Sequence, residues 1–430
     1  MKRFKYIGAA FLLMIAVISC TIGAAKQKIV LGSFSNSEIT VADGKKVRVG
    51  TELAWMFNEE HPNIELVYED IAAEGRAIHT VVATMLASRT STYDVFISDV
   101  VWQPEFPLRK WYEPLDKIFP KSEQAKYIPG MINAWSMGGH IYGVPFTSDF
   151  QVMFYRKDLL EKAGFAPPDT WDELISICQK LQNAPGLYGF AADWQIHSDC
   201  TFSPMLWSAG GDFFDSKNIT VNSPAGEKAM QLMMDMNLKY KIMQPGVTSM
   251  SHDETRNLFS EGRAIFHQNW LYAYSRSQSE EAKVQNKVGV IGIPRMSKDS
   301  PKITPLPTGG WSWSVNPFSP RKTAAFEVVK WLASYKVQKW SAMYWNQTPA
   351  LLSLYDDAEV NKAHPEYALF AKLAPYTKSR FEKYDHFMEW LDRVRQEAGS
   401  AIIGKQTAKQ AVNNLADTLS IWANLPEKYK

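Results

Sequence analysis

The alternation of strand-like and helix-like segments limits this chain to one broad class of fold. Short apolar runs rich in branched residues alternate with longer stretches in which apolar residues recur at helical spacing. Strands joined through helices in this way are typical of a parallel-rich sheet covered by helices. The strand-like segments are residues 28–34, 64–68, 93–97 and 151–155, and the helix-like segments are residues 52–60, 74–87 and a stretch from Asp158.

One helix start can be located from its capping residues. The segment 167–174 reads PPDTWDEL, which places Thr170 at the N-cap and Glu173 three residues later. In such a capping box each side chain satisfies a free backbone N–H of the first turn, and acidic residues there suit the helix dipole. We therefore predict that a helix begins immediately after Thr170.

Composition excludes several classes of protein. The chain has 430 residues, of which 46% are apolar and 21% charged, so it is long enough for two or three cores. A disordered tail and a small disulfide scaffold are excluded. The formal net charge is only +2, without the basic excess that a phosphate backbone attracts, so we expect no nucleic-acid partner.

The first twenty residues have the pattern of an export signal. Three basic residues within 2–5 precede an apolar run over 7–18, which is too short to cross a bilayer of roughly 30 Å as a helix. Residues 17–20 resemble a lipobox ending in Cys20, whose thiol would carry lipid, whereas small residues before and at Ala25 permit ordinary cleavage there. We expect an extracytoplasmic protein, either lipid-anchored through Cys20 or soluble in the periplasm, with no other membrane contact.

Two further cysteines, Cys178 and Cys200, leave two alternatives open. An exported chain lies in an oxidising compartment, where the pair can form a disulfide if the backbone brings them within reach. The alternative is two buried apolar thiols. Neither cysteine belongs to a CxxC pair, so the sequence does not indicate a thiol nucleophile.

Three motifs in a fixed order resemble one protein family. They are YGVP at 142–145, FYRKDLLEKAG at 154–164 and PDTWDEL at 168–174. Together they are similar to the carbohydrate-type extracellular solute-binding proteins of bacterial ABC importers. Further matches extend the resemblance over essentially the whole chain after its signal: residues 93–95, Asp99, Trp102, 259–270, 309–311, 330–332, Pro349 and 404–415.

The resemblance implies an α/β fold of the type II periplasmic-binding-protein class, in which two lobes, each a mixed sheet flanked by helices, enclose a ligand cleft. The chain is expected to cross between the lobes near residues 145–150, 305–310 and 350–358. The expected N-terminal lobe comprises residues 26–147 and 308–352, and the expected C-terminal lobe comprises residues 148–307 and 353–430. A ligand closes such a hinge only by binding the closed form better than the open one.

The resemblance also implies a function. The chain would capture a carbohydrate, in particular an oligosaccharide, act as a monomer, and deliver the ligand to the permease subunits of an ABC importer. The same fold could instead bind a polyol, a glycerol phosphodiester or another small polar solute, or serve as a sensory subunit without transport. The sequence has no HExxH, no Gly-rich phosphate loop and no GxSxG, so we expect no enzyme, no cofactor, no metal and no catalytic residue.

Aromatic platforms are the first requirement of a sugar site, because a sugar ring presents flat C–H faces. The stacking candidates are Trp270 and Trp311, with Trp313 and Trp102 behind them, and the family positions favour the first two. Gly310 precedes Trp311 in a Gly-Gly pair that would let backbone approach a ligand closely. For any single tryptophan the alternative is a core side chain.

Polar groups for the hydroxyl rim are the second requirement. Asp99 follows an apolar run at the carboxyl end of a strand, where open α/β sheets bind ligands, or else it caps the next helix. Asp149 stands at the first expected crossing, where related proteins face the sugar, with a hinge cap or salt bridge as its alternative. Arg380 matches an arginine that some relatives use on ligand hydroxyls, with a solvated surface arginine as its alternative.

One segment departs from the family pattern. The loop over 33–46 is longer than its counterpart in relatives and holds Asn36 and Glu38, to which we assign no ligand role. Because this loop often faces the sugar, the departure leaves the class of substrate open.

Overall fold

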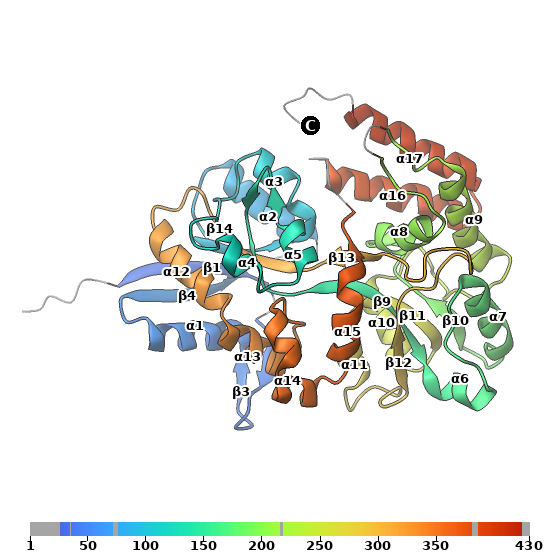
Figure 1. The fold of residues 1–430 in the computed structure, drawn as a ribbon, viewed down its shortest axis with the longest axis horizontal. Coiled ribbons are helices and arrows are strands. Elements are labelled where there is room, and N and C mark those ends of the chain that lie inside the picture. The colour runs from blue at the N-terminus through green and yellow to red at the C-terminus, as the bar shows by residue number, and fades with distance from the viewer. Residues whose placement is uncertain (1–25, 35, 72–75, 216–217, 381–385, 424–430) are drawn as a thin grey trace, which may run out of the picture.

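The computed structural model describes residues 26–34, 36–71, 76–215, 218–380 and 386–423. The predicted signal segment, Cys20 and the cleavage site at Ala25 lie outside these residues. Figure 1 shows two lobes side by side, each built around its own sheet. Nowhere in the described ranges is a helix both long and apolar enough to cross a bilayer.

The first sheet confirms the predicted strand and helix rhythm. In it, β1 pairs with β4 and with β5 in parallel, while β14 runs antiparallel to β5 and to β8. Among the described residues the sheet has five strands, in the order β4 (Ile64–Asp70), β1 (Gln27–Ser33), β5 (Val95–Asp99), β14 (Trp311–Val315) and β8 (Val144–Pro145). The first helix ends at the C-cap His61, as the proline after it predicts.

The second sheet is mixed, because β9 pairs antiparallel with β11, β12 and β13 while β10 and β11 are parallel. In the described part of the chain its strands are β10 (Tyr188–Ala191), β11 (Ala264–Trp270), β9 (Asp149–Arg156), β13 (Leu306–Gly309) and β15 (Thr377–Lys378), with β12 (Val288–Ile291) also on β9. Its central strands are buried along nearly their whole length, as expected for a sheet covered on both faces.

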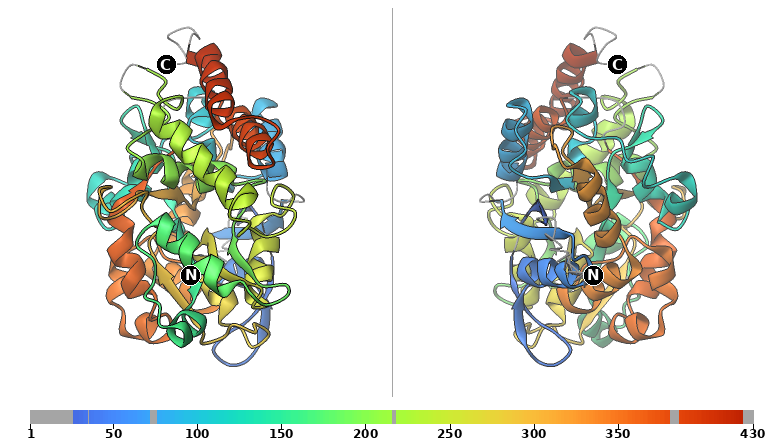
Figure 2. Two further views of the ribbon diagram at one scale, coloured as in Figure 1. Left: turned by 90° about the vertical axis from the view of Figure 1, so that its right-hand side faces the viewer. Right: turned by 90° about the vertical axis from the view of Figure 1, so that its left-hand side faces the viewer.

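Helices cover both sheets, and three of them form a layer on the outside of the second lobe. In that lobe α9, α16 and α17 lie side by side, which is clear when the lobe is viewed end-on (Figure 2). Around the first sheet lie α1 (Val49–Glu60), α2 (Arg76–Ala87), η1 (Val100–Trp102), α3 (Glu105–Leu108), α4 (Lys121–Gln124), α5 (Pro129–Ala134), α12 (Lys322–Leu332) and α13 (Tyr335–Trp345). Around the second lie α6 (Lys157–Ala163), α7 (Trp171–Leu181), α8 (Ser198–Ser208), α9 (Pro224–Leu238), α10 (His252–Ser260), α11 (Tyr272–Ser277), α16 (Phe387–Ile402) and α17 (Ala408–Ala423). The remaining elements are the hairpins β2 (Glu38–Thr40) with β3 (Lys46–Arg48) and β6 (Ser136–Met137) with β7 (His140–Ile141), and the segments η2 (Leu352–Asp356), α14 (Ala358–Ala363), α15 (Tyr367–Leu373) and η3 (Ala374–Tyr376).

The predicted capping box is present at the start of α7. The Glu173 N–H donates to Thr170 Oγ1 at 3.3 Å, and Glu173 Oε2 accepts the Thr170 N–H at 3.3 Å. Both orphan donors are satisfied locally, which is why this boundary could be predicted from eight residues.

The structure contains no disulfide between Cys178 and Cys200, which the sequence had left as one of two alternatives. Both cysteines are free and buried. The Cys178 side chain packs against Gly189 of β10, whereas Cys200, on α8, faces the guanidinium of Arg380. The two thiols therefore belong to different packing environments, and the alternative of two buried apolar thiols holds.

Candidate functional site

The segments that connect the two sheets lie side by side. Residues 146–148 link β8 of the first sheet to β9 of the second, and Gly310 alone separates β13 from β14. The N–H groups of Phe146 and Thr147 both donate to the Trp311 carbonyl, at 2.8 and 3.2 Å, and the Ser148 N–H donates to the Thr348 carbonyl at 2.9 Å. A third segment, residues 348–349, thus lies against Thr147 and Ser148, just before the range 350–358 where the third crossing is predicted. The lobe limits drawn from the sequence stay a prediction.

Gly310 serves the crossing through its backbone. Its φ of +122° lies in a region open to glycine, and a Cβ there would lie 2.8 Å from the Thr147 carbonyl oxygen. The sequence prediction made Gly310 a point of close approach to a ligand; the contact that requires glycine in the structure is with the neighbouring crossing segment.

Trp311 is the first residue of β14, at the end of that strand, and is half-buried. Its N–H donates to Thr147 Oγ1 at 3.0 Å, which ties it to the crossing. Phe34 lies 4.5 Å from its ring at a tilt of 56°, and Trp102 meets it edge-on at 6.3 Å. Trp102 is itself only 2% exposed, so it supports the Trp311 ring from behind. Phe34, at the end of the first strand, is a neighbour that the sequence prediction missed.

Asp99 lies opposite Trp311 across the β5–β14 pair. Its Oδ1 accepts the Val101 N–H at 3.3 Å, so the predicted capping alternative is realised, at the start of η1. The carboxylate also remains near the opposite lobe. Burial raises the pKa of Asp99 to about 6, the charges of Arg380 and His79 oppose this, and the charge of Asp199 adds to it.

Trp270 ends β11 in the second sheet and is 7% exposed. A Cβ on Gly309 would lie 2.4 Å from Trp270 Cζ3, so the ring rests directly on the backbone that leads into Gly310. The His197 ring meets it edge-on at 5.5 Å, and the Arg380 guanidinium lies over it at 5.9 Å. Trp270 is therefore held on one side by glycine and on another by a cation.

Arg380 is buried rather than solvated, which excludes the surface alternative. It forms an ion pair with Asp199 on α8, and its Nη2 donates to the Thr308 carbonyl at 3.1 Å. Asp199 was not predicted; it matters because it neutralises most of the charge that Arg380 brings into the cleft.

Asp149 is the first residue of β9, immediately after the crossing. Its Oδ1 accepts the Leu271 N–H at 3.1 Å. Burial raises the pKa of Asp149 to about 7; hydrogen bonds from the backbone oppose this, and the charge of Asp99 adds to it. The charge of Asp99, from the first sheet, therefore disfavours the ionisation of Asp149, in the second sheet.

Trp313 is not available to a ligand, which corrects its place among the stacking candidates. It lies on the same face of β14 as Trp311 but two residues further into the sheet. Its side chain is fully buried and packs against Phe146 at 5.1 Å. Trp311, at the end of the strand, is therefore half-buried, whereas Trp313 belongs to the core.

The long 33–46 loop forms a hairpin of β2 and β3 that projects from the first lobe (Figure 1). Asn36 Oδ1 accepts the Gly50 N–H at 2.9 Å at the start of α1, and Glu38 pairs with Lys46 at 3.0 Å in an exposed position. Both residues thus have structural partners within their own lobe, and the extra length lies in the hairpin.

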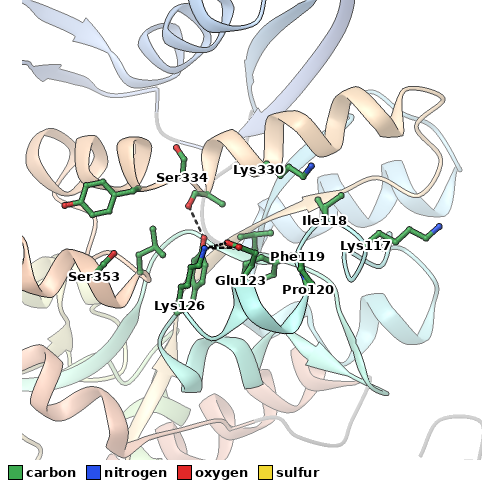
Figure 3. Close-up of a pocket in the computed structure, with 14 residues that line it drawn as sticks. Lys117, Ile118, Phe119, Pro120, Glu123, Lys126, Lys330, Ser334 and Ser353 are labelled. Carbon is green, nitrogen blue, oxygen red and sulfur yellow. Dashed lines mark hydrogen bonds and ion pairs between the residues drawn. The ribbon is translucent and has the colours of Figure 1, made fainter.

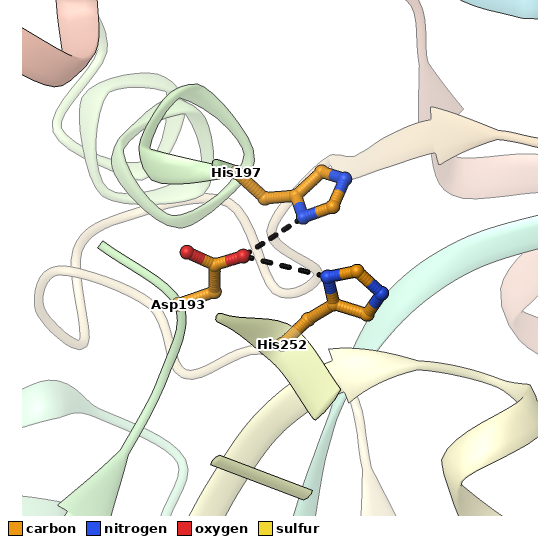
Figure 4. A group of neighbouring side chains, drawn as sticks. All are labelled: Asp193, His197 and His252. Carbon is orange, nitrogen blue, oxygen red and sulfur yellow. Dashed lines mark hydrogen bonds and ion pairs between the residues drawn. The ribbon is translucent and has the colours of Figure 1, made fainter. Parts of the chain in front are cut away.

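A cluster of Asp193, His197 and His252 lies behind Trp270 and was also missed (Figure 4). Burial opposes the ionisation of Asp193, but the hydrogen bond from His197 and the nearby imidazole of His252 outweigh it and hold the pKa of Asp193 well below its usual range. Burial lowers the pKa of His197. The only sequence signal was the spacing of four between Asp193 and His197, and His252 is distant in the chain.

A separate pocket of about 620 Å³ opens in the first lobe, between α4 and the turn from α12 to α13 (Figure 3). Lys126, Lys330 and Tyr335 contribute to its lining, and Lys126 is paired with Glu123 at 2.8 Å. None of the predicted ligand residues lines it. The predicted ligand residues Trp311, Trp270 and Asp149 lie next to the crossing instead.

Comparison with known proteins points to one family. A family model described as bacterial extracellular solute-binding protein matches residues 39–339. A probable ABC transporter-binding protein of Deinococcus radiodurans is 32% identical over 290 residues, which cover 65% of this chain and 67% of that protein.

Solved structures show the same two-lobed architecture. Maltose-bound MalE3 of T. maritima superposes with a TM-score of 0.81 at 29% identity, covering 92% of this chain and 99% of that one. The GacH receptor of Streptomyces glaucescens, solved without ligand and with acarbose, has a TM-score of 0.80 at 22% identity, covering 93% and 100%, and is alike in fold. The predicted fold class is confirmed, and the chain belongs to the bacterial extracellular solute-binding proteins, the receptors of ABC transporters.

Proposed function

We propose that this receptor captures a neutral carbohydrate between its lobes and delivers it to the permease of an ABC importer. The observation that carries the proposal is that Trp311 of the first sheet and Trp270 of the second both lie beside the crossing, Trp311 hydrogen-bonded to Thr147 and Trp270 packed on Gly309. Aromatic rings from two lobes suit the flat C–H faces of sugar rings.

The carboxylates of Asp99 and Asp149 favour a ligand rich in hydroxyl groups. Asp99 and Asp149 are acceptors in a poorly solvated place, and burial raises the pKa of each. A sugar hydroxyl donates to a carboxylate without adding charge, so it replaces lost water and lowers the cost of closing the lobes. Closure is then favoured by the ligand because these hydrogen bonds form only when both lobes reach it.

The same charges disfavour one alternative ligand. A glycerol phosphodiester carries a negative charge, which would meet Asp99 and Asp149, while the nearby Arg380 is already paired with Asp199. A neutral polyol remains compatible. The maltose in the T. maritima relative, whose identity to this chain is 29%, supports a sugar, in particular an oligosaccharide.

Ligand binding can be tested by calorimetry and thermal unfolding against mono- and oligosaccharides, polyols and phosphodiesters. A ligand at a hundred times its Kd stabilises the folded state by about 2.7 kcal/mol, which raises Tm by several degrees. We expect a sugar to give this shift, and Trp311→Ala to abolish it. Trp55→Ala is the matched control, because Trp55 is 57% exposed on α1. Binding of phosphodiesters alone would refute the carbohydrate proposal.

Transport and sensing are separated by a second experiment. Deleting the gene should abolish uptake of the labelled sugar that the purified receptor binds. Normal uptake with loss of the chemotactic or transcriptional response would assign the receptor to sensing.

The anchor is a further part of the proposal. We propose that the protein functions outside the cytoplasmic membrane as a monomer, held by lipid on Cys20 after removal of residues 1–19. Metabolic labelling with a fatty acid should mark the wild type and leave Cys20→Ala unmarked. Recovery of an unlabelled wild-type chain beginning after Ala25 would show the soluble periplasmic form instead.

A further inference from the structure

Three side chains capable of binding a metal converge in the second lobe, next to Trp270. Asp193 follows β10, His197 is the residue before α8, and His252 is the first residue of α10. Figure 4 shows both imidazoles turned toward the same carboxylate. We propose that Asp193, His197 and His252 bind one divalent transition-metal ion, with Zn²⁺ as the best fit.

The distances suit a tetrahedral ion. Asp193 Oδ2 lies 2.9 Å from His197 Nδ1 and 3.6 Å from His252 Nδ1, and the three ligand atoms lie within 4.8 Å of one another. Zn²⁺ with bonds of about 2.0–2.1 Å needs its ligand atoms roughly 3.3 Å apart. Small side-chain rotations are therefore sufficient to enclose the ion, and three protein ligands leave one position for water or a solute hydroxyl.

The carboxylate is held in place by the backbone. Asp193 Oδ1 accepts the N–H groups of Gln195 and Ile196, at 2.7 and 2.8 Å. This leaves Oδ2 directed at the two imidazoles. Because Oδ1 of the carboxylate is already fixed, little conformational entropy is lost when Oδ2 binds a metal.

His252 adds an independent sign. Its Nδ1 is buried and makes no hydrogen bond within the described residues, although it points at Asp193. A buried ring nitrogen whose nearest acceptor lies 3.6 Å away is poorly satisfied, and an ion between it and Oδ2 would satisfy both atoms. The His252 carbonyl is fixed as well, because it accepts from Asn269 Nδ2 at 2.9 Å.

The surroundings resemble those of metal-bound histidines. His252 Nε2 lies 3.8 Å from Asp253, whose Oδ1 accepts from the Tyr272 hydroxyl at 3.0 Å and pairs with Arg256 at 2.5 Å. At this distance the Asp253 carboxylate makes no hydrogen bond to the ring, but it adds negative charge beside it, which favours a bound cation. The His197 and His252 side chains keep about a quarter of their surface exposed, at 24% and 27%, so an ion can enter.

Ligand chemistry favours zinc over the common hard cations. Ca²⁺ and Mg²⁺ bind oxygen, whereas two imidazoles and one carboxylate suit Zn²⁺ and its first-row neighbours. Because the His197 ring meets Trp270 at 5.5 Å, the ion would lie directly behind the stacking platform and stiffen it.

The test is a Zn²⁺ titration of the chelator-stripped protein in competition with a chromophoric chelator. We expect one equivalent per chain, and a loss of affinity of at least roughly tenfold in Asp193→Asn and in His252→Ala. Asp193→Asn keeps the acceptor for Gln195 and Ile196, so it should fold, which circular dichroism will verify. His140→Ala is the matched control, since His140 Nδ1 lies 2.9 Å from Asp116 without a second imidazole, and it should not change binding.

Co²⁺ substitution supplies a second readout. Tetrahedral nitrogen and oxygen coordination should give intense visible d–d bands in the wild type that are lost in His252→Ala. Less than one equivalent of Zn²⁺ in the wild type, or affinity unchanged in both cluster variants, would overturn the site. Neither readout involves a sugar, so the metal site and the carbohydrate proposal can fail separately.

Discussion

Trp270 rests on Gly309 with no room for a side chain between them, since a Cβ on Gly309 would lie 2.4 Å from the indole ring. Gly309 ends the strand that leads into the crossing, and Trp270 ends a strand of the second lobe. The proposed stacking platform and the segment that crosses between the lobes are therefore in direct contact, so a substitution in one should affect the other.

Substituting Gly309→Ala should displace Trp270 and weaken ligand binding by at least roughly tenfold, while overpacking costs about 1–3 kcal/mol of stability. Calorimetry and urea unfolding measure the two effects. Gly292→Ala is the matched control, because its Cβ would meet only Leu373 Cδ2, at 3.7 Å. Wild-type affinity in Gly309→Ala would mean that the ring has no part in binding.

The buried thiols lead to a prediction about reactivity. Burial raises the pKa values of Cys178 and Cys200 well above the ordinary value of a thiol, so both should resist alkylation in the native protein. Unfolding in urea should expose both at once. Peptide mapping after alkylation, with and without prior reduction, measures this, and a requirement for reduction would reveal the disulfide that the structure lacks.

Local sequence patterns predicted local structure, but they could not predict how deeply a side chain is buried or which distant segments it contacts. The capping box at Thr170 needed only neighbours in the chain, so it could be predicted. Trp311 and Trp313 are the same residue type on the same face of β14. Trp311 is half-buried because it lies at the end of the strand, whereas Trp313, two residues further in, is part of the core. His252 joins Asp193 through contacts between distant segments, which no spacing in a single sequence reveals.

The ion pair between Arg380 and Asp199 should behave as a coupled buried unit. Arg380→Met leaves the Asp199 carboxylate buried without its cation, so we expect a loss of about 3–5 kcal/mol in the free energy of unfolding. Adding Asp199→Asn removes the unpaired charge and should restore much of that loss. Urea unfolding of both single variants and the double variant measures the coupling, and additive effects would contradict it.

Asp149 should make the ligand-free protein less stable as pH rises. Its pKa is about 7 in the folded state against an ordinary 3.8, so between these values the folded state binds more protons than the unfolded state, and stability falls with pH. The charge of Asp99, in the first lobe, adds to the raised pKa of Asp149, whereas the charge of His252 lowers it. Asp149→Asn keeps the acceptor for the Leu271 N–H and removes the charge. It should therefore raise Tm above pH 7, with a gain of up to about 4 kcal/mol in the free energy of unfolding, and have no effect below pH 3.8. Asp43→Asn removes the same charge from an exposed loop and serves as the control. A Tm difference that does not change with pH would show that Asp149 is solvated in the ligand-free protein, because a hydrated carboxylate gains nothing from losing its charge.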